Sequence, residues 1–254
     1  MDDGAFIVGG QALNLWAERY SHAPELTLYG PYTSKDLDYF GHRDAAEKLA
    51  ERLGGRVLIP SSDDATPQSA IVVARVGGEE IRIDFLKYVK GVPVKALADS
   101  AVELVLPVHT VDGRGELALP LMHPLHCLQS RIANVVELKR GDDVAVRQLS
   151  AAPIVVREYI SEMLDIGDHA EATRTLQRLF EHLRSDINGR VAHRHAGRDP
   201  AEIIDHFAAD ERLDPRYREY NIPGMQAVLR RKRGIIARMM DYLGSRHRTG
   251  TDIR

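Results

Sequence analysis

The spacing of apolar residues changes along the chain, and this change divides it into two parts. Up to about residue 120, short apolar runs typical of strands alternate with amphipathic helical segments. The predicted strands lie in residues 5–10, 36–40, 56–60, 69–76, 79–89 and 102–107. Two helices are predicted here, over residues 11–20 and 43–55. Gly77-Gly78 separates two of the strands and predicts a tight hairpin.

From about residue 121 the apolar period is helical throughout. The predicted helices cover residues 123–140, 144–164, 169–186, 199–207 and 224–246. We expect Pro153 to interrupt the second of them, because proline removes a helical hydrogen bond. The sequence therefore predicts an α+β fold, with a mixed-sheet domain over residues 1–120 and an all-helical domain over residues 121–254.

Composition limits the classes of function without selecting one. The 254 residues are 44% hydrophobic and carry a formal net charge of -3, which gives no general attraction to nucleic acid or membrane. The first residues, MDDG, do not resemble a signal peptide, and no apolar run approaches the roughly 18 residues of a membrane span. The single Cys127 excludes an internal disulfide. We expect a cytoplasmic protein with no membrane partner.

Two carboxylates are spaced to share one face of a strand. In TSKDLDYFG, Asp36 and Asp38 lie two residues apart, so strand alternation places both side chains on the same side. Such a pair repels itself unless a cation lies between the two groups, and carboxylate oxygens suit Mg²⁺ or Mn²⁺. An isolated pair of this kind is more often a solvated strand end.

A third acid occupies the polar face of a later strand. In EEIRIDFLKYV, Asp84 alternates with the apolar residues Ile83 and Phe85. It lies either on an open sheet face or, if residues 79–89 pair with residues 36–40, beside Asp36 and Asp38.

The first strand ends directly in a glycine pair. In FIVGGQALN, Gly9-Gly10 joins an apolar triplet to a helix. A tight turn accounts for this, and so does a close approach of another group to the backbone, where a side chain would interfere.

Together these motifs resemble the polymerase-β-type nucleotidyltransferase superfamily. The matching residues are Val8-Gly9-Gly10, Asp36-Leu37-Asp38 and Asp84. The pattern GGQAL, with Ser34 just before the acid pair, is most similar to minimal and toxin-type nucleotidyltransferases, including the abortive-infection group.

The resemblance implies a nucleotidyltransferase-fold domain with a two-metal site. Asp36, Asp38 and Asp84 would hold two Mg²⁺ or Mn²⁺ ions, and NMP would pass from an NTP to a hydroxyl as pyrophosphate leaves. Gly9 and Gly10 would let the phosphates reach backbone N–H groups at the helix N-terminus.

Four further residues are candidate nucleotide contacts, three of them through the same resemblance. Ser34 matches the family position before the acids, and Lys35 is a candidate contact to base or phosphate, although a packed surface loop is the alternative. Family members also carry a Lys and then an Asp on the helices after the sheet. The matches here are Arg131 and Asp143, or its neighbour Asp142, and a surface salt bridge is the alternative for Arg131.

The acceptor is not specified by these motifs. A tRNA end, a protein side chain or a small molecule such as an aminoglycoside fits the implied chemistry. A toxin role, with an antitoxin as partner, is the most specific form of the hypothesis.

Two rival functions and one metal site need separate consideration. A nucleotide-binding module without turnover keeps the fold, and an RNA-binding protein would use the basic run Arg230–Arg233, which is otherwise a solvated helix face. His123, His126 and Cys127 lack the further ligands of a zinc site, so we interpret them as helix-start histidines and a core cysteine.

Overall fold

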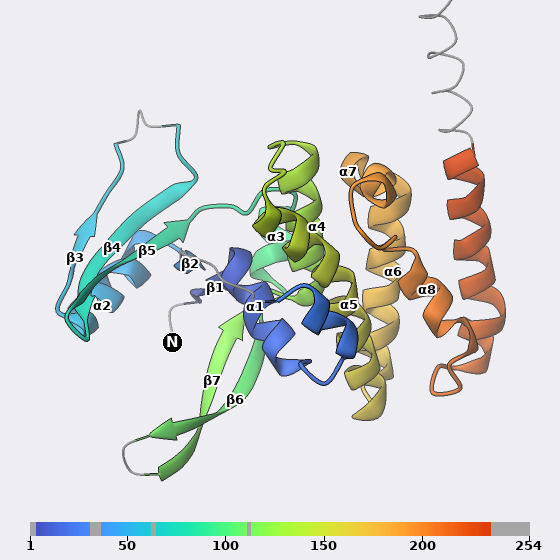
Figure 1. Ribbon diagram of the computed structural model, residues 1–254, viewed down its shortest axis with the longest axis horizontal. Coiled ribbons are helices and arrows are strands. Elements are labelled where there is room, and N and C mark those ends of the chain that lie inside the picture. Colours follow the sequence, from blue (N-terminus) through green and yellow to red (C-terminus); the bar gives the residue numbers. More distant parts are fainter. Residues whose placement is uncertain (1–3, 31–36, 62–64, 111–112, 235–254) are drawn as a thin grey trace, which may run out of the picture. The chain divides into compact units, whose positions relative to one another are not determined.

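The fold is mixed α+β, as the sequence predicts. The computed structural model of the chain describes residues 4–30, 37–61, 65–110 and 113–234. They form one seven-stranded sheet together with helices (Figure 1). The chain divides into two compact units, Met1–Tyr159 and Ile160–Arg254, and the division falls within helix α5 (Asp143–Asp165). The sequence predicts the change from sheet to helices at residue 121, which is not where this division falls. The predicted domain bounds therefore stay a prediction.

The first unit contains the whole sheet. Its strands are β1 (Phe6–Val8), β2 (Leu37–Phe40), β3 (Arg56–Leu58), β4 (Gln68–Val76), β5 (Glu79–Leu86), β6 (Val102–Thr110) and β7 (Gly113–Leu121). They lie in the order β3-β4-β5-β2-β1-β7-β6, so that β2 and β1, from the start of the chain, occupy the middle. β2 is parallel to β5 and antiparallel to β1. The sheet is therefore mixed.

The hairpin predicted at Gly77-Gly78 is confirmed. β4 and β5 are antiparallel and pair from Val76 and Glu79 inward. Gly77 and Gly78 have φ values of 61° and 90°, which glycine adopts without steric cost. The turn residues therefore determined this register directly.

Strand β7 was not predicted from the sequence. Its residues, GRGELALPL, include two glycines and a proline, which weaken a strand pattern. The strand nevertheless pairs with β6 along its full length and with β1 at one end, where Ile7 lies opposite Leu121. Pairing with its neighbours outweighs its weak intrinsic preference.

The helices of the first unit include two that follow the sheet. The unit contains α1 (Gly9–Arg19), the 3₁₀ turn η1 (Pro24–Leu28), α2 (Arg43–Leu53), α3 (Val94–Ala98), α4 (Pro124–Val136) and most of α5. Pro153 lies inside α5 without ending it, contrary to the prediction. Its neighbours Ala152 and Ile154 are buried, and packing of this apolar segment offsets the lost hydrogen bond.

At the start of α4, a histidine and the cysteine have the structural roles that the sequence indicated. The His123 side chain caps the helix by accepting a hydrogen bond from the backbone N–H of Leu125. Cys127 is completely buried, and burial raises the pKa of its thiol to about 12. A helix-start histidine and a core cysteine are thus confirmed.

The two faces of the sheet differ at β4. Ala70, Val72 and Ala74 are buried on the face against which α2 packs. The alternating residues Ile71 and Val73 are only half-buried on the opposite face. This second face of β3, β4 and β5 is the more open one.

The second unit is helical in the part that the structure describes. Its elements after α5 are α6 (His169–Ser185), α7 (Ile187–Val191), η2 (Ala192–Arg194), α8 (Glu202–His206), η3 (Phe207–Ala209) and the π-helical turn η4 (Tyr217–Asn221). Residues 222–234 continue as a helix. Among the described residues of the whole chain, no helix has both the length and the apolar character needed to cross a membrane.

Candidate functional site

Asp38 and Asp84 lie side by side in the middle of the sheet. They are direct partners in the parallel pair of β2 and β5, where Leu37 lies opposite Ile83 and Asp38 opposite Asp84. Directly opposed residues of neighbouring strands point to the same face, so the two carboxylates share it. Of the two alternatives that the sequence left open for Asp84, the structure shows the one in which these strands pair. Asp36 lies outside the described residues.

Asp84 is oriented by two hydrogen bonds. The Gln68 amide Nε2 donates to Oδ2 at 2.7 Å, and the Arg82 Nε donates to Oδ1 at 3.0 Å. The Asp84 side chain is only 19% exposed, whereas that of Arg82 is 61% exposed. Gln68 was missed in the sequence, since it starts a different strand and no local pattern links it to Asp84. Each carboxylate oxygen of Asp84 is thus held in place.

Gly9 brings the start of α1 against Asp38. Val8 pairs with Asp38 across β1 and β2, and Gly9 begins the helix with a φ of 71°. A Cβ on Gly9 would lie 2.6 Å from Oδ2 of Asp38. Both the positive φ and the space require glycine at this position. The tight turn predicted at Gly9-Gly10 is confirmed, and Gly10 is buried in the first turn of the helix.

Arg131 is a largely enclosed cation near this pair. On α4, its Nη1 donates to Oε1 of Gln148 at 2.7 Å and its Nη2 donates to the Ser130 hydroxyl at 3.3 Å. Its Nε is buried and has no hydrogen-bond partner among the described residues. Burial is the main cause that lowers the pKa of Arg131, and the charge of Asp38 is among those that raise it.

The alternative of a surface salt bridge for Arg131 is wrong. Within the described ranges its side chain forms no ion pair, and its hydrogen-bond partners are uncharged. Gln148, a buried residue of α5, was also missed in the sequence because it lies 17 positions away on another helix. Within the described ranges, the guanidinium is therefore held by uncharged partners.

Asp142 and Asp143 are at the start of α5. The Asp142 side chain accepts a hydrogen bond from the backbone N–H of Ala145 at 3.0 Å, which lowers the pKa of Asp142. Asp143 is exposed in the first turn. In the part of the chain that the structure describes, no hydrogen bond or ion pair joins Asp143 to Asp38 or Arg131. A role of Asp143 in nucleotide binding stays a prediction.

Three of the predicted site residues fall outside the described ranges. These are Ser34, Lys35 and Asp36. Within the described ranges, no three His, Cys, Asp or Glu side chains form a group that could hold a metal ion. The two carboxylates that do come together, on Asp38 and Asp84, are oxygen donors of the kind that suits Mg²⁺ or Mn²⁺. The donor chemistry therefore fits a hard divalent cation.

Half of the basic run in the second unit is engaged within that unit. Lys232 donates to the backbone carbonyl of Arg184 at 2.8 Å, and Arg233 forms a two-pronged ion pair with Asp199. Arg230 and Arg231 are exposed. The sequence suggested a solvated helix face for this run. The structure shows instead that only part of the run is solvated.

Comparisons of the chain with family models, with curated proteins and with solved structures give no match. What the site does is therefore inferred from its own residues.

Proposed function

We propose that the chain is a metal-dependent nucleotidyltransferase that transfers NMP from an NTP to an acceptor hydroxyl. The observation that carries this proposal is the arrangement of Asp38 and Asp84 as direct neighbours, with the Gly9 turn against Asp38. Two like charges placed side by side cost free energy unless a cation or a shared proton compensates them. The finer fold assignment, a nucleotidyltransferase-type domain with a helical partner, belongs to the same proposal.

The carboxylates are the proposed metal ligands. Asp38 and Asp84 would hold Mg²⁺ or Mn²⁺ together with Asp36, and the bound ions would neutralise the triphosphate and lower the pKa of the attacking hydroxyl. Gln68 and Arg82 fix the orientation of the Asp84 carboxylate through their hydrogen bonds. Asp84 is also the proposed acceptor of the hydroxyl proton.

The glycine turn and Arg131 are the proposed phosphate contacts. The proposed anion site is the N-terminus of α1 at Gly9 and Gly10, where backbone N–H groups and the helix dipole favour negative charge. The guanidinium of Arg131 carries an unpartnered Nε–H and lies within electrostatic range of Asp38. It supplies the positive charge that a triphosphate needs. Ser34 and Lys35 complete the proposed set, and Asp143 keeps its predicted role.

The acceptor class and the biological role extend the proposal. A tRNA end, a protein side chain and a small molecule all carry suitable hydroxyls, and a toxin opposed by an antitoxin is one setting for such an enzyme. RNA binding through Arg230–Arg233 receives less support, because Lys232 and Arg233 are engaged within their own unit.

Label transfer from nucleotide tests the proposal. The full chain is incubated with Mg²⁺ and each α-³²P-labelled NTP, and label is measured in tRNA, protein and small-molecule acceptors. The variants are Asp38→Asn and Asp84→Asn, and the matched control is Glu80→Gln, an exposed acid on the same strand as Asp84.

We expect transfer by the wild type and by Glu80→Gln, and none by the two aspartate variants. Nucleotide binding without transfer to any acceptor would favour a non-catalytic binding module instead. Transfer that survives Asp38→Asn would overturn the assignment of the site.

A further inference from the structure

Arg82 is a cation bound directly to the central acid pair. Its Nε donates to Oδ1 of Asp84 at 3.0 Å. The Arg82 side chain is 61% exposed, whereas that of Asp84 is only 19% exposed. An ion pair whose cation is solvated in this way contributes little free energy. A cation with a stronger attraction to carboxylate oxygens therefore competes with Arg82 for Asp84.

Asp84 keeps a second support when Arg82 moves away. The Gln68 amide donates to the other carboxylate oxygen, Oδ2, at 2.7 Å. Gln68 in turn accepts a hydrogen bond from the hydroxyl of Thr66. Both of these partners are uncharged, so they orient the carboxylate without neutralising it. Departure of Arg82 thus opens Oδ1 and leaves Asp84 oriented through Oδ2.

Strand register places Arg82 toward the glycine turn. Val8, Asp38 and Asp84 form one row across β1, β2 and β5. Since β1 is antiparallel to the other two strands, the residue after Val8 and the residues before Asp84 lie on the same side of this row. Those residues include Gly9, which begins α1, and Arg82, about 6.6 Å from Asp84 along β5. Arg82 therefore lies toward the proposed phosphate site.

The side chains concerned also share one face of the sheet. A Cβ on Gly9 would lie 2.6 Å from Oδ2 of Asp38, so the turn is on the face that carries the Asp38 carboxylate. Asp84 points to this face as the direct partner of Asp38. Arg82 is two residues from Asp84 in the same strand, so alternation places it there as well. The guanidinium can thus reach both the acids and an anion at the turn.

Arg82 and a divalent cation compete for the same oxygen. Two cations against one carboxylate oxygen repel each other. Carboxylate oxygens are the ligands that Mg²⁺ and Mn²⁺ prefer, and a doubly charged ion is attracted to the pair of Asp38 and Asp84 more strongly than a guanidinium. The released guanidinium then offers a planar set of N–H donors, which matches the geometry of a phosphate group.

We propose that Arg82 is an exchangeable counter-ion of Asp84. It neutralises part of the acid pair before a divalent cation binds, and it then leaves Asp84 and binds the phosphate groups of the nucleotide. The inference rests on the proposed function. It adds to that function a phosphate-binding residue and the order in which the site is assembled.

Metal affinity without nucleotide tests the exchange. Mn²⁺ binding to the full chain is measured by electron paramagnetic resonance for the wild type, Arg82→Gln and Asp84→Asn. The matched control is Arg75→Gln, which removes another exposed arginine. Arg75 lies on β4, four residues from the position opposite Asp84, which is about 13 Å along the strand and beyond the Debye length.

We expect Arg82→Gln to bind Mn²⁺ about fivefold more tightly than the wild type, because the ion no longer has to displace a competing cation. Arg75→Gln should stay within about twofold of the wild type. Asp84→Asn should bind Mn²⁺ more weakly, since the substitution removes a charged ligand. Arg82 is exposed, so these differences are not expected to reflect a loss of folding.

Phosphate affinity tests the second half of the inference. Inorganic tripolyphosphate, which carries the charged part of a nucleotide without its base, is titrated calorimetrically into the same proteins at saturating Mg²⁺. We expect its affinity to fall about tenfold in Arg82→Gln, for loss of a charge-assisted hydrogen bond, and to be unchanged in Arg75→Gln. The affinities for metal and for phosphate thus change in opposite directions. A merely structural role of Arg82 would weaken both.

Other outcomes separate this inference from the proposed function. Mn²⁺ affinity that is unchanged or weaker in Arg82→Gln overturns the exchange, and unchanged tripolyphosphate affinity overturns the phosphate contact. Either result leaves the nucleotidyltransferase proposal intact where label transfer still depends on Asp38. Absence of Mn²⁺ binding in both the wild type and Arg82→Gln overturns the metal site, and with it both proposals.

Discussion

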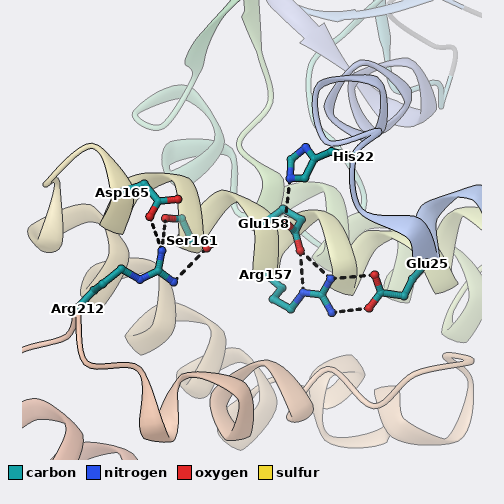
Figure 2. A network of polar contacts seen from close by, with 7 residues as sticks. All are labelled: His22, Glu25, Arg157, Glu158, Ser161, Asp165 and Arg212. Carbon is teal, nitrogen blue, oxygen red and sulfur yellow. Dashed lines mark hydrogen bonds and ion pairs between the residues drawn. The ribbon is translucent and has the colours of Figure 1, made fainter.

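Two clusters of carboxylates in the first unit are built in opposite ways. Near η1 and α5, Arg157 lies between two acids: its Nη1 and Nη2 donate to the two oxygens of Glu25, at 2.8 and 3.2 Å, and its Nε donates to Glu158 at 2.8 Å (Figure 2). His22 lies 3.4 Å from Glu158 on the other side. The hydrogen bond to Glu25 is the main cause that raises the pKa of Arg157. Here each charge has an opposite charge beside it.

The central strands show the reverse arrangement. Asp38 and Asp84 are direct neighbours of like charge, and the ion partner of Asp84 is the exposed Arg82. A half-buried bidentate pair stabilises the fold, whereas adjacent carboxylates oppose it. The like-charged pair therefore contributes less to stability than the Arg157 cluster does, and this supports the proposed role in binding a cation.

The helical unit contains a second example of the first arrangement. Arg212 donates to Asp165 and to the Ser161 hydroxyl (Figure 2). It also donates to Asp210. These contacts, with the Asp210 hydrogen bond first, raise the pKa of Arg212. Structural acids in both units thus converge on an arginine.

Among the variants, Asp38→Asn should have the largest effect on activity. It should also distinguish the central carboxylate pair most clearly from the Arg157 cluster. We expect label transfer to fall about 10³-fold, as for loss of a group that acts in the transition state. Stability should be unchanged or slightly higher, because the substitution removes like-charge repulsion from Asp84. Transfer assays and urea unfolding measure the two quantities. A large loss of stability would mean that Asp38 is a structural residue.

Arg157→Ala should change stability and not catalysis. Its removal leaves Glu25 and Glu158 facing each other without the guanidinium, at a site where the Arg157 side chain is 18% exposed. We expect a loss of about 2 kcal/mol in the free energy of unfolding. The control is Arg43→Ala, which breaks the exposed pair with Glu47 and should have no measurable effect. Equal effects of the two variants would contradict the structural role of Arg157.

Gly9→Ala should combine backbone strain with displacement of Asp38. The positive φ costs roughly 1 kcal/mol for alanine, and contact with Oδ2 of Asp38 adds about as much again. The matched control is Gly54→Ala, where φ is 60° but no atom lies within 4 Å of the added Cβ. Thermal unfolding of both variants, with and without Asp38→Ala, measures the contact. If Asp38→Ala does not reduce the loss of stability caused by Gly9→Ala, the contact between the added Cβ and Asp38 is not the cause of that loss.

Gln148→Leu should have the smallest effect and should act through Arg131. Loss of the 2.7 Å hydrogen bond frees the guanidinium to leave its position near Asp38. We expect KM for the NTP to rise about tenfold with kcat nearly unchanged, since a phosphate contact is weakened in ground and transition states alike. Gln177→Leu, at an exposed position of α6, is the control. A fall in kcat alone would show that Gln148 does not position a binding group.

Local sequence patterns predicted the helices and strands themselves better than they predicted how these elements pack and pair with one another. Alternation assigned Asp84 to the polar face of its strand, and Gly77-Gly78 identified the hairpin before it. Pro153 and β7 were misjudged for one physical reason. Burial of the residues around Pro153, and pairing of β7 with two other strands, outweighed unfavourable local preferences.

The residues of the candidate site also divide into those that a local pattern reveals and those that depend on packing. Gly9, Asp38 and Asp84 were found from sequence because each breaks a local pattern, a glycine between strand and helix or an acid within a strand. Gln68 and Gln148 were not found, because an amide in a strand or helix carries no such signal. Their roles depend on partners in other elements, Asp84 and Arg131.

The sequence by itself determined which residues could share a face, because side-chain alternation is a property of a single strand. Only the tertiary structure decided that β2 lies parallel to β5, in the register that sets Asp38 against Asp84. Parallel neighbours are joined through distant chain segments, and their register is selected by packing of the whole sheet and its helices. The chemistry of the site was thus encoded locally, and its assembly was not.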